Sequence, residues 1–181
     1  IKNLSIDPGC SFDSSALGFL EILGNFTSSG TFVNGGAVTR FGLSGNNTIW
    51  TVATSTFNNV IINKTTASDK VDALTNLSIG GTLEIYSGIL NMASSSSTVK
   101  GATTINGSYA KLDIGSSTTT LVGAVNVING GTLLLPNVTP APILKLGGDL
   151  TVDSGGFFVS QSSFNKITSR IPGTEFYGFD I

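Results

Sequence analysis

The carboxylate side chains are the part of this sequence best suited to chemistry. The chain has no histidine and one cysteine, so Ser-His-Asp and Cys-His catalytic groups and His/Cys metal sites are excluded. Eleven aspartate and glutamate residues remain. Paired carboxylates hydrolyse glycosides, and carboxylate oxygens are the preferred ligands of Ca²⁺. If the chain were an enzyme, a polysaccharide hydrolase or lyase would be the class that these residues fit, and their spacing decides whether it does.

Two of the carboxylates, Glu84 and Asp113, are separated by nearly one period of the repeat described below. We expect them to lie on one outer face, with Lys111 and Lys145 also pointing outward on related strands. Mixed charges of this kind are typical of a solvated surface with cross-strand pairs, each of which stabilises little. The sequence therefore predicts no catalytic residues and no enzyme activity.

The polar segment 65–72 is predicted to be a loop, and it contains Asp69 and Asp72. These two carboxylates could contact a Ca²⁺ ion, but two are too few to define a site, so that question stays open. The glycine pairs Gly80-Gly81 and Gly130-Gly131 lack the Lys-Ser/Thr and helix that follow in a phosphate-binding loop. We interpret them as turn glycines and predict no metal and no cofactor.

The composition argues against two further classes of function. Charged residues make up 11% of the 181 residues, against about 25% in a typical soluble domain. The net charge is -2 and no basic run is present, so nucleic acid is not a predicted partner. No apolar run approaches the roughly 18–20 residues that cross a membrane, so no membrane insertion is predicted. The start at Ile1 shows no signal-peptide pattern, from which we expect a processed or partial chain.

An internal repeat sets the positions of the structural elements. The phrase Leu-Ser-Ile-Gly-Gly-Thr-Leu at 77–83 matches Val-Ile-Asn-Gly-Gly-Thr-Leu at 127–133. Small residues in this and related phrases stand at positions 9, 30, 55, 81, 107, 131 and 156. Their steps indicate a repeat of about 25 residues, a period that is typical of solenoids. The same alignment predicts one equivalent slot, occupied by Phe12, Phe32, Phe57, Leu83, Tyr109, Leu133 and Phe157.

Short segments with alternating apolar and polar residues fill each repeat, for example Val60–Ile62, Leu83–Ile85 and Ile143–Leu146. Such alternation and the many β-branched residues are typical of strands. A β-sandwich also uses short strands, but it has no reason to repeat regularly, whereas a solenoid stacks each coil on the previous one. We therefore predict an all-β fold, a parallel, right-handed β-helix (β-solenoid) of about seven coils, over residues 1–160. Residues 161–181 are predicted to be a terminal strand, a cap or a continuation of the solenoid.

Three segments carry a family resemblance: 23–32 (Leu-Gly-Asn-Phe-Thr-Ser-Ser-Gly-Thr-Phe), 44–49 (Ser-Gly-Asn-Asn-Thr-Ile) and 56–64 (Thr-Phe-Asn-Asn-Val-Ile-Ile-Asn-Lys). They resemble the repeats of large bacterial surface proteins, the autotransporter passengers and the filamentous-haemagglutinin-type adhesins. The resemblance covers most of residues 1–160. It implies secretion, a right-handed β-helix, and a role in adhesion, surface coats or filaments, and it carries no catalytic residues to transfer.

These observations together predict a non-catalytic extracellular module at the cell surface, with a structural or adhesive role that includes a self-assembling filament or coat subunit. The ends of an open solenoid expose strand edges, and Ile1 shows no polar cap. The expected partners are therefore other copies of the chain or neighbouring segments of a longer surface protein. The candidate assembly contacts are Ile1, Phe176, Tyr177, Phe179 and Ile181.

The alternative is a β-helix protein that binds or degrades polysaccharides, with cell-surface glycans as its partners. Degradation would require a groove lined by carboxylates, and binding would require exposed aromatic side chains, for which Trp50 is the strongest candidate in the sequence. The array Thr118-Thr119-Thr120 would suit ice binding only if every coil repeated it, which the sequence does not do.

Overall fold

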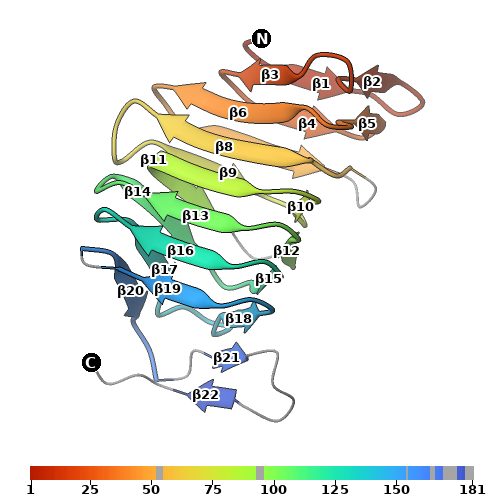
Figure 1. Ribbon diagram of the computed structural model, residues 1–181. Coiled ribbons are helices and arrows are strands. Elements are labelled where there is room, and N and C mark those ends of the chain that lie inside the picture. Colours follow the sequence, from red (N-terminus) through yellow and green to blue (C-terminus); the bar gives the residue numbers. More distant parts are fainter. Residues whose placement is uncertain (52–54, 93–95, 154, 164–165, 169–174, 178–181) are drawn as a thin grey trace.

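The computed structural model of the chain is a β-solenoid of about seven turns, in which parallel strands stack from the N-terminal to the C-terminal end (Figure 1). The structure describes residues 1–51, 55–92, 96–153, 155–163, 166–168 and 175–177. Those residues form strands, turns and loops and no helix. The predicted all-β solenoid is thereby confirmed, while its handedness stays a prediction.

The chain passes over three faces in each turn, because Gly- and Asn-containing corners separate its short strands. Face 1 contains β1 (Leu4–Ile6), β4 (Phe26–Ser28), β7 (Asn47–Thr51), β9 (Lys70–Ala73), the second half of β11 (Leu83–Asn91), β14 (Ala110–Asp113), β17 (Thr132–Leu135) and β20 (Phe157–Ser160). Face 2 contains β2 (Ser11–Asp13), β5 (Thr31–Val33), β10 (Ser78–Ile79), β12 (Ser97–Val99), β15 (Thr118–Leu121), β18 (Ile143–Leu146) and β21 (Lys166–Thr168). Face 3 contains β3 (Phe19–Ile22), β6 (Val38–Leu43), β8 (Asn59–Lys64), the first half of β11, β13 (Thr103–Asn106), β16 (Val125–Ile128) and β19 (Leu150–Val152).

The coils are shorter than the sequence repeat predicts, since the observed spacing is about 22 residues. They are also unequal in length. On face 1 Val71 is in register with Leu90, whereas Leu133 is in register with Phe158, which lies further along the chain from its partner. Coils of unequal length can still stack, because the corners absorb the extra residues while the strands keep their register. What recurs regularly from coil to coil is therefore the position of the strands, whereas the number of residues between equivalent positions varies.

The sequence alignment was wrong because it matched different corners of the coil with one another. The pair Gly80-Gly81 precedes β11 at the corner between faces 2 and 3, whereas Gly130-Gly131 precedes β17 at the corner between faces 3 and 1. The predicted equivalent slot holds for Phe12 and Phe32, which are register partners on face 2, but is wrong further along the chain for the same reason. Leu83 is in register with Val60 and Thr103 on face 3, and Leu133 is in register with Leu112 on face 1. Both kinds of corner use glycine followed by an apolar strand, so their sequences are alike.

The interior is one apolar cluster that extends along the solenoid from Ile6 to Ile167. Phenylalanine fills its N-terminal part: the ring centroids of Phe26, Phe32 and Phe57 are 4.9 to 5.2 Å apart. Further along the chain, leucine, isoleucine and valine take over. Strand alternation produces this core, because every second side chain of each strand points inward. Phe12 and Phe32, which the alignment placed in one slot, are register partners, and their ring centroids lie 6.3 Å apart in a stacked arrangement.

The two ends of the solenoid differ in how their strand edges are covered. At the C-terminal end β21 pairs with β18 in parallel, so the stack on face 2 continues to residue 168. The strand β22 (Glu175–Tyr177) then pairs with β21 in the antiparallel direction. At the N-terminal end β1, β2 and β3 each pair only with the next coil within the described residues. Among the described residues of this region, β21 thus continues the parallel stack and β22 runs in the opposite direction.

Close stacking at the corners predicts the effect of Gly123→Ala. A Cβ atom on Gly123 would lie 2.5 Å from the carbonyl carbon and oxygen of Gly101 in the previous coil. We expect the variant to lose about 1–3 kcal/mol of unfolding free energy, the usual cost of overpacking. Urea denaturation followed by circular dichroism measures this as a lower midpoint.

The matched control is Gly36→Ala, because a Cβ atom there meets nothing within 4 Å. Its midpoint is expected to equal that of the wild type or to rise slightly. Equal midpoints for Gly123→Ala and Gly36→Ala would contradict the close approach of neighbouring coils.

Candidate functional site

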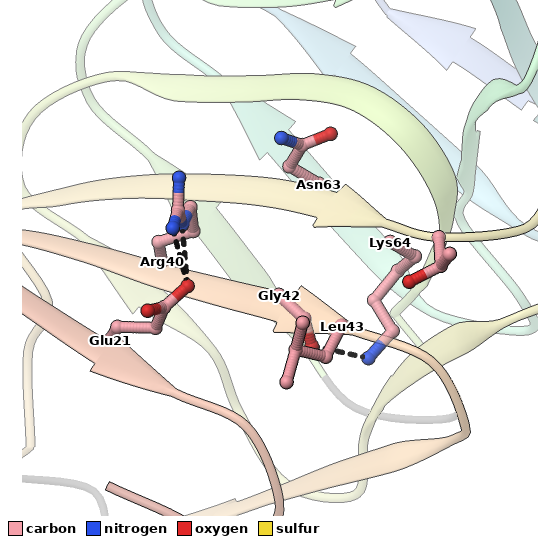
Figure 2. Close-up of a pocket in the computed structure, with 7 residues that line it drawn as sticks. Glu21, Arg40, Gly42, Leu43, Asn63 and Lys64 are labelled. Atoms are coloured by element: carbon pink, nitrogen blue, oxygen red, sulfur yellow. Dashed lines mark hydrogen bonds and ion pairs between the residues drawn. The ribbon is translucent and has the colours of Figure 1, made fainter.

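A surface pocket of about 250 Å³ lies where the strands β3, β6 and β8 end, at the corner between faces 3 and 1 (Figure 2). This is smaller than the roughly 300–1,000 Å³ of typical small-molecule pockets. Its lining is mainly polar and consists of Glu21, Arg40, Gly42, Leu43, Asn63, Lys64 and Thr65. Three successive coils contribute to it, so the pocket exists only because the coils stack.

An ion pair forms one wall of the pocket. Glu21 and Arg40 are register partners on β3 and β6, so strand pairing brings them together. Arg40 donates from Nε and Nη2 to Oε1 of Glu21 at 2.9 and 2.5 Å, and its guanidinium lies 5.1 Å from the centroid of the Phe19 ring. About a third of each charged side chain is exposed. The opposite charges of Glu21 and Arg40 compensate each other at this wall of the pocket.

Lys64 lies at the inner side of the same pocket. Alternation along β8 makes it an inward-pointing residue, after Val60 and Ile62, and only 3% of it is exposed. Its Nζ donates to the backbone oxygen of Gly42 at 3.0 Å and to Oδ1 of Asn47. Burial lowers the pKa of the Lys64 ammonium, while the negative charge of Asp69 acts in the opposite direction.

Asn47 begins β7 and is buried, with 2% exposed. The preceding corner is tight, because β6 ends at Leu43 in a left-handed backbone conformation (φ 59°) and Gly45 follows at φ 92°. The Asn47 side chain also donates from Nδ2 to the backbone oxygen of Leu23 at 3.0 Å, which fixes the orientation of its amide. In the next coils the equivalent inward positions are apolar, occupied in turn by Val71, Leu90, Leu112 and Leu133.

Asp69 completes this group from the loop before β9. Its Oδ2 atom is buried and receives no hydrogen bond from the residues that the structure describes. Sequence reasoning considered Asp69 only as a Ca²⁺ ligand and did not identify Lys64 or Asn47 as site residues. The signal for Lys64 was present, since the alternation Val60, Ile62, Lys64 places a charged side chain at an inward position. Nothing in the sequence indicated its partner.

The suggested Ca²⁺ ligands Asp69 and Asp72 have different surroundings. Asp72 points outward from β9, forms an ion pair with Lys70 at 3.1 Å and accepts a hydrogen bond from Asn91 Nδ2 at 2.9 Å. Asp69 instead acts electrostatically on Lys64. Within the described ranges no group of three or more His, Cys, Asp or Glu side chains could hold a metal ion.

The expectation that Glu84 and Asp113 share an outer face is wrong. Glu84 lies on face 3 in register with Ile61 and Thr104, whereas Asp113 lies on face 1 in register with Asn91. The cause is the bend in β11, whose two halves belong to different faces. The lysines are separated in the same way, since Lys111 lies on face 1 and Lys145 on face 2.

Of the candidate assembly residues, Ile1 lies at the N-terminal side of the solenoid, and Phe176 and Tyr177 lie at the opposite side, on β22 (Figure 1). The amino group of Ile1 donates to the backbone oxygen of Glu21 at 2.7 Å, and the Ile1 side chain is 52% exposed. Phe176 and Tyr177 belong to β22, the antiparallel strand at the edge of face 2. Phe179 and Ile181 lie outside the described residues.

Exposed aromatic side chains of the described residues occur on β3 (Phe19), on β7 (Trp50), on β20 (Phe157) and at the corner that carries Tyr86 and Tyr109. Trp50, 36% exposed, lies on the outside of β7. Tyr86 and Tyr109 are 42% and 62% exposed and lie one coil apart at the corner between faces 3 and 1, where Tyr109 O accepts from Gly88 N at 2.8 Å. Tyr86 donates its hydroxyl to Glu84 Oε2 at 2.5 Å, and this hydrogen bond raises the pKa of the phenol. The corner with Tyr86 and Tyr109 was missed because Tyr109 was aligned with core positions.

The exposure of the Glu21–Arg40 pair predicts a modest effect for Arg40→Met. Exposed pairs contribute about 0.2–1 kcal/mol and an exposed cation–π contact about 0.5–1 kcal/mol. We expect a loss of about 1 kcal/mol at low salt, measured by urea denaturation, that shrinks in concentrated NaCl because salt screens exposed charges. Lys100→Met, at another exposed position, is the control. A salt-independent loss of several kcal/mol would mean that the pair is a buried one.

The described residues contain no helix that is long and apolar enough to span a membrane. Comparison of the chain with protein-family models, with curated proteins and with solved structures gave no match.

Proposed function

We propose that this chain is a non-catalytic structural module of an extracellular surface protein, in which it forms a stiff segment of a stalk, coat or filament. The observation that carries the proposal is the ladder on face 1, which is unbroken from β1 to β20. Every coil is joined to the next by backbone hydrogen bonds along the solenoid axis. A repeated structure of this kind transmits load from coil to coil and can be lengthened by adding coils.

The interior and the outer rows support the same role. One apolar cluster runs through the coils, so neighbouring coils cannot slide without opening the core. Outside, small polar side chains follow one another along the axis. On face 2 the row runs through Ser78, Thr98 and Thr120, and on face 3 it runs through Thr104, Asn126 and Thr151. Rows of neutral hydroxyl and amide groups are suited to weak contacts spread over a long surface, as adhesion requires.

Three of the described carboxylates are engaged by neighbouring side chains, which favours a structural role for them over a catalytic one. Glu21 is paired with Arg40, Asp72 with Lys70, and Glu84 accepts the hydroxyl of Tyr86. Glycoside hydrolysis needs two carboxyl groups that face one substrate across a groove. The extracellular location is part of the proposal and rests on the resemblance to secreted surface repeats.

Immunoelectron microscopy of the source cells tests the location and the shape together. An antibody raised against residues 1–160 is expected to label thin rods or fibres outside the cell envelope. Label confined to the cell interior would overturn the proposal. Mass determination on the extracted material then distinguishes two versions of the proposal. Fibres of 181-residue subunits indicate end-to-end assembly. A much longer chain indicates that these residues are a segment of a stalk.

A second candidate, polysaccharide binding, is favoured by the corner that carries Tyr86 and Tyr109. Two exposed aromatic rings on adjacent coils, beside the Glu84 carboxylate, offer apolar faces together with hydrogen-bond acceptors. Sugars present C–H faces and hydroxyls, so they match both.

Affinity electrophoresis in gels that contain soluble polysaccharides tests this candidate. We expect retardation of the wild type by at least one polysaccharide and at least a tenfold loss of affinity, about 1.4 kcal/mol, in the Tyr86→Ala/Tyr109→Ala double variant. Phe157→Ala, which removes an exposed aromatic ring on another part of face 1, is the matched control. Equal mobility of the wild type and the double variant would exclude this corner as a binding site.

A further inference from the structure

Two polar side chains, Lys64 and Asn47, are in contact inside the corner between faces 3 and 1, and Asp69 is near enough to act electrostatically on Lys64. Lys64 comes from the end of β8, Asn47 from the start of β7, and Asp69 from the loop before β9. Asp69 stands shortly before Val71, which is the register partner of Asn47. Stacking of two successive coils therefore brings an amine, a carboxamide and a carboxyl group to one place.

The amine is in direct contact with the carboxamide. Lys64 Nζ donates to Asn47 Oδ1, so the nitrogen lies next to the carbonyl carbon, Cγ, to which that oxygen is bonded. The amide cannot turn freely, because its Nδ2 donates to the backbone oxygen of Leu23 at 3.0 Å. Both partners are buried, with 3% and 2% exposed.

The lysine side chain is also held in place by the coil that follows. A Cβ atom on Gly88 would lie 2.5 Å from Lys64 Cγ and 2.6 Å from Lys64 Cβ, so the glycine backbone packs directly on the lysine stem. Holding two reacting groups together in this way replaces an encounter in solution by an intramolecular step, with effective molarities of about 10⁵–10⁸ M in well-oriented cases.

We propose that Lys64 and Asn47 are joined by an intramolecular isopeptide bond, and that Asp69 transfers the protons for its formation. Lys64 Nζ attacks Asn47 Cγ and forms the new C–N bond. The tetrahedral intermediate then collapses, the bond from Cγ to Nδ2 breaks, and Nδ2 leaves as ammonia. The proton that Nζ loses goes to the departing nitrogen by way of the Asp69 carboxyl group, so atoms and charge balance without an oxidant or a cofactor.

Each group has the property that this step requires. The nucleophile must be the neutral amine, and burial lowers the pKa of Lys64. The proton carrier must have a free oxygen, and Asp69 Oδ2 is buried with no hydrogen-bond partner among the described residues. Glu21, the carboxylate that lines the nearby pocket, is engaged by Arg40. Lys64 also lines this pocket, which gives the ammonia a route to solvent.

The bond would join residues 17 positions apart, close to the length of one coil. It would link successive coils covalently near the N-terminal end, in the direction in which a stalk or fibre carries load. The inference concerns the chemistry of the chain itself and does not depend on the proposed function.

Intact mass spectrometry of the purified, denatured full chain tests the bond directly. The wild type is expected to be lighter than its sequence by the mass of one ammonia molecule. Asn47→Ala and Lys64→Met are expected to have the masses of their sequences. The matched control, Asn46→Ala, changes the exposed neighbouring asparagine and is expected to keep the loss. A wild type with the full mass of its sequence would overturn the proposal.

Digestion with trypsin locates the bond, because trypsin does not cleave after an acylated lysine. We expect one peptide, residues 41–70, that lacks one ammonia and gives no fragment ions from cleavage between residues 47 and 64. An ammonia loss in a peptide that ends at Lys64 would indicate a succinimide at an asparagine, and would also overturn the proposal. In the Asp69→Asn variant the cross-linked fraction is expected to fall at least tenfold. An unchanged fraction would remove Asp69 from the mechanism and leave the bond itself in place.

Discussion

The parallel backbone ladder between successive coils is the constraint on which the rest of this structure depends. A single coil is a ring of short strands whose amide and carbonyl groups point along the axis, and only another coil can satisfy them. The corners must therefore approach as closely as the strands do. This is why Gly101, Gly123 and Gly148 follow one another at the corner between faces 2 and 3, where each would place a Cβ atom within about 2.6 Å of backbone in the coil before it. Composition, corner chemistry and core all follow from this requirement.

Polar residues inside the solenoid are concentrated in its N-terminal half, and hydrogen bonds between coils satisfy most of them. Asn34 donates from Nδ2 to Ser14 Oγ and to Thr39 Oγ1, both at 3.1 Å, and accepts from the backbone nitrogen of Asn58 at 2.6 Å. The group around Lys64 differs because it includes an ionisable amine beside a carboxyl oxygen that lacks a partner among the described residues. Burying such groups costs free energy unless they are paired. We therefore expect a buried amine and an unpaired carboxyl oxygen at one place to serve a reaction. A covalent bond would remove the charge of the lysine and with it the cost of burial.

A structural role and an internal cross-link are consistent physical answers to one mechanical problem. Backbone ladders and the shared core join neighbouring coils by noncovalent contacts, and such contacts can open locally. A bond between Lys64 and Asn47 would add a covalent link between two successive coils.

By itself the sequence determined the class of fold, because alternation in segments such as Val60–Ile62 and glycine-rich corners admit few other arrangements. It did not determine the register. Both kinds of corner place glycine before an apolar strand, so Gly80-Gly81 and Gly130-Gly131 look equivalent in the sequence although they lie at different corners. The candidate site depended entirely on that register. The inward position of Lys64 could be inferred from its own strand, but its neighbours Asn47 and Asp69 belong to other segments, and coils of unequal length leave their alignment undefined until the strands pair. Side-chain direction is a local property of a strand, whereas the meeting of three side chains is a property of the stacked coils.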